Sequence, residues 1–596
     1  MKKIFICMTA MMLMLTGCMK NEIPDYSEYQ KQQINENVQK VFGTTFDPNH
    51  TWCTTTAGQI TISDIPAGTE SVSLLVYVKE DDGETSMLSL NQADVNGRQS
   101  VTLNYDAPTD NLGLFVAFLS KTNIELRAVS QNSSTRAAMT RGAEAEEPAY
   151  TLPTGELRIS IIEDSYASKR GWIPGEKLYQ MADYTSQKMS VADYSDEYKA
   201  VFRAMIFSYF KNGRKYNNLP LVQRSACYNA DSYPFTTGKE PIVVSPVYKN
   251  DGGYQEVVNS DLYYYYYKDA DIAGKDAVKF IEQLPKYKAI QFDQCIAADD
   301  EIKKHASYAL VYWGDGIPDE NTVGSYQFPE GYRIGFMVRA KTTAEGGKKQ
   351  GELYGDGRLN NYINNYGNFK SSKLGTDGPR SCWMTVNGKM LLCFESGTDT
   401  DFNDAIFEIE GGVDPIIYIP ELEETTYTFC FEDTELGDYD MNDVVIKAKR
   451  LNETTVQWTI VACGAYDELQ VKNINGNVIN GNSEVHALFG VDNSRTYINT
   501  VGGIIYNPVS EQVKVSKDFS FLDESNQPYI YDMTTSKIVK LSKRGEDPHG
   551  IMIPKDFRWP IERVCIKNAY LQFNSWGENQ VTSTDWYLHP EDDKVI

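Results

Sequence analysis

Two short stretches of the sequence repeat one another and crowd acidic side chains together. Residues 393–406 read CFESGTDTDFNDAI, and residues 430–445 read CFEDTELGDYDMNDVV. After a small difference in loop length, both give Cys-Phe-Glu, then Asp-x-Asp-[Phe/Met]-Asn-Asp, then an apolar strand. Such agreement indicates an internal repeat. Carboxylate and amide oxygens at alternate positions of one turn are typical ligands of a hard cation.

The acids and asparagines of these two turns are the candidate metal ligands. They are Glu395, Asp399, Asp401, Asn403 and Asp404 in the first turn, and Glu432, Asp438, Asp440, Asn442 and Asp443 in the second. So many carboxylates in one turn repel one another unless a counterion is present. Ca²⁺ accepts about six to eight oxygens in flexible geometry, and Mg²⁺ requires a smaller octahedron, so the pattern predicts Ca²⁺ for at least one copy. Acids that only hydrogen-bond to the backbone of a tight turn are the alternative.

The first copy also resembles the start of an EF-hand loop, with Glu410 at the twelfth position. We reject this interpretation because the sixth position is Asp404 and not glycine. The sequence from 405 to 410 alternates as a strand does, which would carry Glu410 roughly 20 Å from Asp404. In the second copy the twelfth position is Lys449.

The elements that must position these turns are mainly strands. Val72, Leu74, Val76 and Val78 alternate, as half-buried strands do, and Asp82-Gly83 is a turn signal. Apolar residues at helical spacing from Tyr198 to Ile206 predict a helix that ends at Asn212-Gly213, and 274–284 predicts a second helix.

The chain is long enough for several domains. We therefore predict a mainly β, multidomain fold with an N-terminal β-sandwich, a mixed α+β middle region and two C-terminal β-sandwich-like domains. The expected segments are a signal peptide (1–17), a lipid anchor and tether (18–42), a β-sandwich (43–130), a linker (131–150), a mixed α+β region (151–300), and β-rich domains carrying the first (301–420) and second (421–596) acidic motifs.

The N-terminus has the pattern of an exported lipoprotein. Lys2 and Lys3 precede an apolar run, which closes with Leu15-Thr16-Gly17-Cys18. This resembles a bacterial lipobox, so we expect lipidation at Cys18 and attachment to the outer membrane. An ordinary signal peptide is the alternative. The sequence does not settle which membrane leaflet holds the protein, or whether the protein faces outward or into the periplasm.

The net charge of the chain limits the classes of molecule that it can bind. The chain has 82 acidic and 57 basic residues, for a formal net charge of −25. This charge repels nucleic acids and concentrates divalent cations. The later cysteines are scattered without metal-binding spacing, so we expect buried free thiols; Cys393 and Cys430, at matching places in the repeat, are candidates for an exception. The cysteines concerned are Cys53, Cys227, Cys295, Cys382, Cys393, Cys430, Cys463 and Cys565.

The aromatic residues suggest sugars as a second class of ligand. Tyr263–Tyr267 is a run of tyrosines in a strand-like context. Exposed aromatic side chains would provide a sugar-binding platform, as could Trp383, Trp576 and Trp586. Packing on both faces of a sheet is the commoner explanation of such a run.

We find no catalytic motif and expect no enzyme. The histidines are His50, His305, His486, His549 and His589, none adjacent to another in sequence, and HExxH and GxSxG are absent. Two carboxylates of a glycosidase remain conceivable among so many acids.

Several segments resemble a known type of protein. Residues 331–410 are similar to a domain of unknown function from secreted bacterial proteins, often found beside calcium-associated modules. The chain from Tyr427, with FEDTELGDYDMNDVV, Phe557-Arg558-Trp559-Pro560 and Asp585-Trp586-Tyr587, resembles the LruC-type domain of Bacteroides-like lipoproteins. FDPNHTWCTTTAGQITI at 46–62 is similar to their opening module. The resemblance implies a Bacteroidota cell-envelope lipoprotein, with no activity or ligand residues to carry over.

These observations favour an outer-membrane lipoprotein with Ca²⁺-stabilised β domains that acts in surface adhesion, interaction or envelope structure. A glycan-binding lipoprotein of a nutrient-uptake system is the alternative, and a hydrolase comes last. Candidate partners are the membrane, a glycan or a surface protein.

Overall fold

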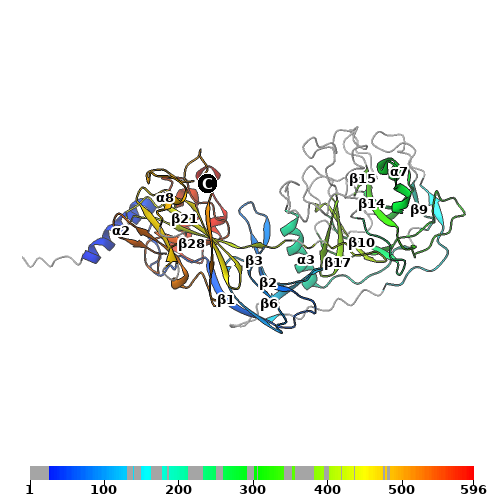
Figure 1. Cartoon of the computed structure of the whole chain (residues 1–596), viewed down its shortest axis with the longest axis horizontal. Helices are drawn as coiled ribbons and strands as arrows, with labels where there is room; N and C mark the ends of the chain where they lie inside the picture. The colour runs from blue at the N-terminus through cyan, green and yellow to red at the C-terminus, as the bar shows by residue number, and fades with distance from the viewer. Residues whose placement is uncertain are drawn as a thin grey trace, which may run out of the picture.

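The computed structural model describes residues 26–130, 138–139, 150–162, 178–183, 187–211, 233–249, 260–291, 301–304, 306–340, 352–355, 381–394, 402–417, 419, 421–434, 436–473, 477–478 and 483–596. The fold is mainly β and multidomain, with several separate sheets, as the sequence predicts. An N-terminal sandwich with β1 and β2 lies between a middle unit with β10 and β14 and a C-terminal unit with β21 and β28 (Figure 1). Within the described residues, no helix combines the length and apolar character needed to cross a membrane.

The N-terminal sandwich brings together the apolar faces of two sheets. One sheet pairs β1 with β4, and the other has the order β19-β3-β2-β5-β6-β7. The strands are β1 (Thr55–Ile62), β2 (Ser71–Lys79), β3 (Thr85–Asp94), β4 (Val101–Pro108), β5 (Gly113–Leu119), β6 (Ile124–Ser130), β7 (Ala138–Met139) and β19 (Glu423–Glu424). Val72, Leu74, Val76 and Val78 share one core, whereas Leu75 points to the opposite face and packs in the core beside α3. The predicted alternation is confirmed.

The middle unit mixes strands from both sides of residue 300. Its sheets have the orders β13-β10-β18-β17-β16 and β15-β14-β11-β12-β9-β8. The strands are β8 (Ile159–Ile161), β9 (Leu178–Met181), β10 (Ile242–Lys249), β11 (Ser260–Tyr267), β12 (Lys286–Gln291), β13 (Tyr308–Ala309), β14 (Arg333–Ala340), β15 (Glu352–Tyr354), β16 (Ser381–Val386), β17 (Lys389–Phe394) and β18 (Ala405–Gly411). Because β10 pairs with β13 and β18, and β11 pairs with β14, the boundary expected at residue 300 is wrong. Regions 151–300 and 301–420 fold together, and this unit is mixed α+β.

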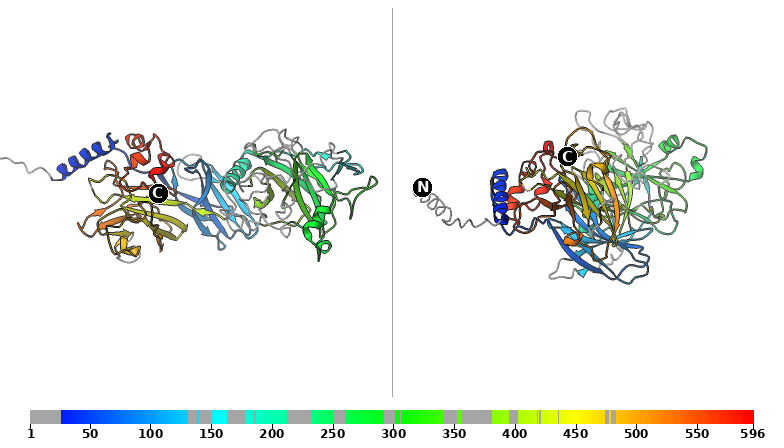
Figure 2. Two further views of the ribbon diagram at one scale, coloured as in Figure 1. Left: turned by 90° about the horizontal axis from the view of Figure 1, so that it is seen from above. Right: turned by 60° about the vertical axis from the view of Figure 1, so that its left-hand side comes forward.

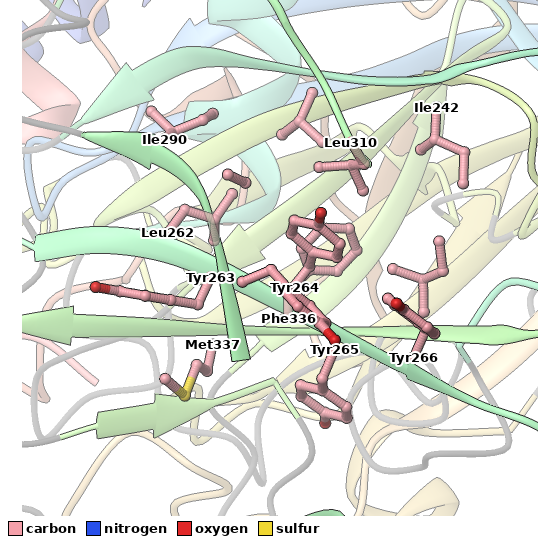
Figure 3. Close-up of a cluster of buried hydrophobic side chains, with 14 of the residues drawn as sticks. Ile242, Leu262, Tyr263, Tyr264, Tyr265, Tyr266, Ile290, Leu310, Phe336 and Met337 are labelled. Atoms are coloured by element: carbon pink, nitrogen blue, oxygen red, sulfur yellow. The ribbon is translucent and has the colours of Figure 1, made fainter. Parts of the chain in front are cut away.

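The tyrosine run forms β11 and is buried on both faces. Every tyrosine from Tyr263 to Tyr267 is at most 8% exposed. Tyr264 stacks with Tyr266, and Tyr265 stacks with Tyr267, as alternation requires (Figure 3). Trp383, Trp576 and Trp586 are buried as well. These aromatic residues therefore form cores and do not present a sugar-binding platform.

Both predicted helices are present. Helix α3 (Asp196–Tyr209) is capped by Ser195, whose hydroxyl accepts from the Tyr198 amide. Its apolar face packs against the sheet that carries β17. Helix α7 (Ala277–Gln283) follows the short α6 (Asp269–Ile272). The expected stop at Asn212-Gly213 and most of the expected linker at 131–150 lie outside the described residues.

The C-terminal unit has two sheets that share a core. Their orders are β25-β22-β21-β20-β28 and β24-β23-β26-β27. The strands are β20 (Thr426–Phe431), β21 (Val444–Asn452), β22 (Thr455–Ala462), β23 (Leu469–Asn473), β24 (Asn477–Val478), β25 (Val509–Lys514), β26 (Pro528–Asp532), β27 (Ile538–Val539) and β28 (Gly550–Pro554). The helices are α8 (Val485–Leu488), η6 (Glu524–Asn526), α9 (Ile566–Ala569), α10 (Phe573–Glu578), η7 (Trp586–Leu588) and η8 (Asp592–Lys594).

The N-terminal segment joins this unit. Helix α2 (Tyr26–Phe42) buries Val38 and Phe42 in an aromatic core with α10, on the face of β20 and β28 opposite the other sheet. In both views of Figure 2 the helix lies at the end of the molecule where the C-terminal unit lies. The expectation that 18–42 is only a tether is therefore wrong for 26–42, because apolar residues of α2 find a partner surface far along the chain.

Candidate metal centre

The two acidic turns occupy matching places in two antiparallel strand pairs. In the middle unit, β17 pairs with β18, and Phe394 faces Ala405. In the C-terminal unit, β20 pairs with β21, and Phe431 faces Val444. Each acidic stretch thus connects the two strands of a hairpin. The strand pairs that flank the two copies are therefore arranged alike among the described residues.

In the first turn, Glu395, Asp399 and Asp401 lie outside the described residues. Asn403 donates from Nδ2 to the Phe210 carbonyl at 2.9 Å. Glu410 lies in β18 and accepts from Lys304 Nζ at 2.8 Å. Glu410 is thus part of a buried ion-pair cluster in the sheet, as a strand and not an EF-hand loop would place it.

The second turn gathers three carboxylates. One oxygen from each of Glu432, Asp438 and Asp440 lies within 4.8 Å of the other two. Glu432 follows β20 directly, and Asp440 lies between Tyr439 (φ 56°) and Met441 (φ 59°). The side chains of Tyr439 and Met441 are fully buried in the aromatic core. Because these two side chains are packed in the core, the left-handed backbone is held in place, and the acidic side chains point to one position.

Among the described residues, two buried oxygens of this turn have no hydrogen-bond partner. They are Oε2 of Glu432, which is 3% exposed, and Oδ1 of Asn442, which is 0% exposed. The amide of Asn442 donates from Nδ2 to the Pro560 carbonyl at 3.0 Å, and this bond fixes the direction of Oδ1. Buried polar atoms are normally paired, so a cation or a hydrogen-bond donor such as water is expected beside these oxygens.

A further carboxylate near this turn comes from a segment that the sequence motif does not contain. Gly464 lies against two acceptors: a Cβ at this position would be 2.1 Å from Asn442 Oδ1 and 2.8 Å from Glu562 Oε2. The pKa of Glu562 is raised by burial and by the charge of Asp438. The amide following it, Arg563 N, donates to Asp440 Oδ2 at 2.6 Å. Glu562 gives no signal in the sequence because its neighbours are not acidic.

Asp443, the last predicted ligand of this turn, has another role. Its Oδ2 accepts from the Asp433 amide at 2.7 Å and so joins the two ends of the turn, next to the strands β20 and β21. The structure therefore brings together the carboxylates of Glu432, Asp438 and Asp440, holds Asn442 in the same turn, and uses Asp443 as an acceptor for a backbone amide.

The electrostatics of this cluster favour a bound cation. Burial, then Asp440 and Asp438, raise the pKa of Glu432 well above its usual range. Burial and Asp438 raise the pKa of Asp440 to about 7. The ligand set is all oxygen and combines carboxylates with an amide, which fits Ca²⁺ better than Zn²⁺ or copper. The donors and their two unpaired oxygens thus fit the predicted ion.

Near this turn, His486 contacts both Glu484 and Cys463. These three residues lack the features of a catalytic triad. His486 contacts Glu484 Oε1 through Nδ1 at 2.6 Å and Cys463 Sγ through Nε2 at 3.6 Å. Cys463 and His486 are 0% exposed. Burial and the acids Asp443 and Glu484 raise the pKa of the Cys463 thiol well above its usual range, opposite to what a nucleophile needs.

The other histidines have separate partners. His50 packs between Trp52 and Trp576, His549 contacts Asp547, and His589 contacts Asp585. His305 lies outside the described residues.

The cysteines correct one expectation. Cys393 and Cys430 are free and lie in different units, so the predicted exception is wrong. The residue facing Cys393 in the sheet is Cys382. Cys53, Cys463 and Cys565 are also free, whereas Cys18, Cys227 and Cys295 lie outside the described residues.

Comparison with known proteins covers part of the chain. A domain family described as Domain of unknown function (DUF4842) matches residues 535–587. No curated protein matches the sequence. A solved structure of a candidate lipoprotein from Bacteroides ovatus is similar at 12% identity and a TM-score of 0.22, over 44% of this chain and 90% of that chain. The LruC-type resemblance stays a prediction. The matched stretch includes Glu562 and Arg563, so the C-terminal side of the candidate metal centre is similar to this domain of unknown function.

Proposed function

We propose that this chain is an outer-membrane lipoprotein, anchored through Cys18, whose C-terminal unit binds Ca²⁺ and acts in surface adhesion, interaction or envelope structure. The observation that carries the metal proposal is the convergence of the Glu432, Asp438 and Asp440 carboxylates, of which Glu432 keeps a buried oxygen without a hydrogen-bond partner among the described residues. The anchor rests on the Leu-Thr-Gly-Cys pattern at residues 15–18.

The metal would join separate parts of the C-terminal unit. The hairpin supplies Glu432, Asp438 and Asp440, and the segment around Glu562 is bound to it through the hydrogen bond from Arg563 N to Asp440 Oδ2. Helix α2 contacts the same turn, because Asn37 Nδ2 donates to the Gly437 carbonyl at 3.1 Å. A bound cation would neutralise the acids and hold these segments together, which suits a rigid domain displayed at a cell envelope.

Thermal unfolding of the mature chain carrying Cys18→Ser tests the metal. The melting temperature is measured with millimolar Ca²⁺, with Mg²⁺ and after chelation. Because binding to the folded state raises stability by mass action, Ca²⁺ at about a hundred times its Kd should add about 2.7 kcal/mol. Asp440→Asn should remove most of this gain, and the matched control Asp492→Asn, at an exposed site, should keep it. A melting temperature indifferent to Ca²⁺ and chelator would refute the metal centre.

The anchor is tested separately in cells. Labelling with a fatty-acid analogue and fractionation of the outer membrane should both detect the natural chain, and both signals should be lost in Cys18→Ala. Unchanged labelling of that variant would contradict the anchor without bearing on the metal.

A further inference from the structure

An exposed aromatic pair lies at the rim of the candidate metal centre. Tyr466 and Tyr497 stack with ring centroids 5.2 Å apart, and Tyr497 Oη donates to Tyr466 Oη at 2.6 Å. Tyr466 is 47% exposed, whereas the tyrosines of β11 are buried. Arg563 donates from Nη2 to Tyr497 Oη at 3.1 Å. An exposed ring, phenol hydroxyls and a guanidinium thus share one patch of surface.

This patch is connected to the metal ligands through short links. Glu562 interacts with the Tyr497 side chain and accepts from Thr500 Oγ1 at 3.2 Å. The Arg563 amide binds Asp440 Oδ2, while its guanidinium reaches outward to Tyr497. Tyr466 lies two residues after Gly464, whose backbone packs on Asn442 Oδ1. The loop with Gly464 and Tyr466 and the loop with Glu562 and Arg563 therefore both connect the rim to the metal centre.

The centre also has room for an outside ligand. The clustered carboxylates of Glu432, Asp438 and Asp440 supply about three oxygens, and Ca²⁺ takes about six to eight. Of the three clustered carboxylates, Glu432 and Asp440 are buried and Asp438 is exposed. The unfilled positions should therefore face solvent on the Asp438 side, where water or ligand hydroxyls can enter.

From this arrangement we infer that the metal centre and the Tyr466–Tyr497–Arg563 rim together bind a saccharide, with two neighbouring hydroxyl groups completing the coordination of Ca²⁺. The inference rests on the proposed metal centre. A sugar ring has an apolar face that packs on an exposed tyrosine, and hydroxyls that accept from a guanidinium and donate to carboxylates. The side chains at this surface match that mixture better than a purely apolar or purely anionic ligand.

A saccharide array probed with the mature Cys18→Ser chain tests the inference, in Ca²⁺ and after chelation. We expect binding only in Ca²⁺, with competition by free methyl α-mannoside or methyl β-galactoside if the bound glycans carry those residues. Tyr466→Ala and Arg563→Met should each weaken binding at least about tenfold. Tyr29→Ala, which removes a tyrosine 52% exposed on α2, is the matched control and should bind as the natural chain does.

The results of these experiments distinguish a failure of the saccharide inference from a failure of the proposed metal centre. Both rim variants should keep the Ca²⁺-dependent rise in melting temperature, because neither side chain is a metal ligand. A normal Ca²⁺ response with no bound saccharide would overturn the inference and leave the metal centre intact. Binding that survives chelation, or Ca²⁺-dependent capture by phosphatidylglycerol vesicles in place of saccharides, would also overturn it.

Discussion

At the residue scale, the candidate metal centre depends on a glycine that leaves room for two oxygens. Gly464→Ala would place a methyl group 2.1 Å from Asn442 Oδ1 and 2.8 Å from Glu562 Oε2, so both oxygens or the backbone at residue 464 must shift. We expect the Ca²⁺-dependent rise in melting temperature to be largely lost and stability to fall by about 1–3 kcal/mol. Gly502→Ala is the control, because a Cβ there meets nothing within 4 Å. Equal Ca²⁺ responses of the two variants would place the ion elsewhere.

The buried ion-pair cluster of the middle unit allows a second residue-scale prediction. Lys304 Nζ lies 3.2 Å from Glu408 Oε1 and 2.8 Å from Glu410 Oε2, and the side chains of Lys304 and Glu408 are 1% and 0% exposed. Lys304→Met leaves excess negative charge in a dry site, so we expect a loss of about 3–5 kcal/mol in urea unfolding.

The adjacent lysine gives a matched control for this cluster. Lys303 is 33% exposed and pairs with the exposed Glu301 at 3.8 Å. Lys303→Met should change stability by less than about 1 kcal/mol. If both variants unfold at the same urea concentration, the buried pairs do not stabilise the middle unit.

At the element scale, the docking of the N-terminal segment should depend on pH through His50. The His50 ring lies 4.2 Å from the Trp52 ring and 4.4 Å from the Trp576 ring, measured between centroids, and burial lowers its pKa. The unfolded chain then takes up the proton first as pH falls. The stability that neutral His50 provides is present above about pH 6.5 and is lost as pH drops below it.

Thermal unfolding at about pH 7.5 and about pH 5.5 checks this expectation. The natural chain should lose up to about 1.4 kcal/mol per pH unit through this group. His50→Gln should show a smaller loss between the two pH values, whatever its stability at the higher one. His589→Gln, at an exposed histidine, should follow the natural chain. An unchanged pH dependence in His50→Gln would contradict the assignment.

Some elements of the fold and of the candidate site could be predicted from the sequence, and others could not. The acidic hairpin was predictable because strand, turn and strand are consecutive, and Phe431 and Val444 mark its ends. The alternation of β2 was predictable for the same local reason. The partner strands of β10 and the carboxylate of Glu562 beside the acidic turn were not, because each is brought in from far along the chain by tertiary packing. The core position of α2 was missed because its apolar residues are few and its surroundings are polar.

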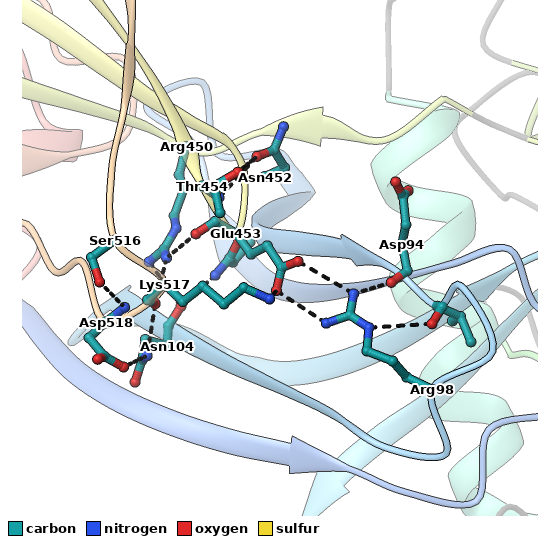
Figure 4. Close-up of polar contacts among 12 residues, drawn as sticks. Asp94, Arg98, Asn104, Arg450, Asn452, Glu453, Thr454, Ser516, Lys517 and Asp518 are labelled. Carbon is teal, nitrogen blue, oxygen red and sulfur yellow. Dashed lines mark hydrogen bonds and ion pairs between the residues drawn. The ribbon is translucent and has the colours of Figure 1, made fainter.

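At the scale of the whole molecule, one arginine ties the N-terminal sandwich to the C-terminal unit. Arg450 of β21 is 2% exposed and donates to the carbonyls of Asn104, Glu453, Lys517 and Phe519. Asn104 belongs to β4 of the sandwich, so the guanidinium spans the junction (Figure 4). Nearby, Arg98 reaches Glu453 at 3.3 Å from a side chain that is 33% exposed.

The two arginines should therefore differ in their effect on cooperative unfolding. Arg450→Met leaves buried carbonyls without a donor, so we expect a loss of roughly 3 kcal/mol. Because the loss falls on the junction, calorimetry should also show one transition separating into two, with the sandwich and the C-terminal unit melting apart. Arg98→Met removes a partly exposed ion pair and should cost less than about 1 kcal/mol without splitting the transition. A single unsplit transition in Arg450→Met would mean that β19 and the remaining contacts of the sandwich suffice to couple the two units.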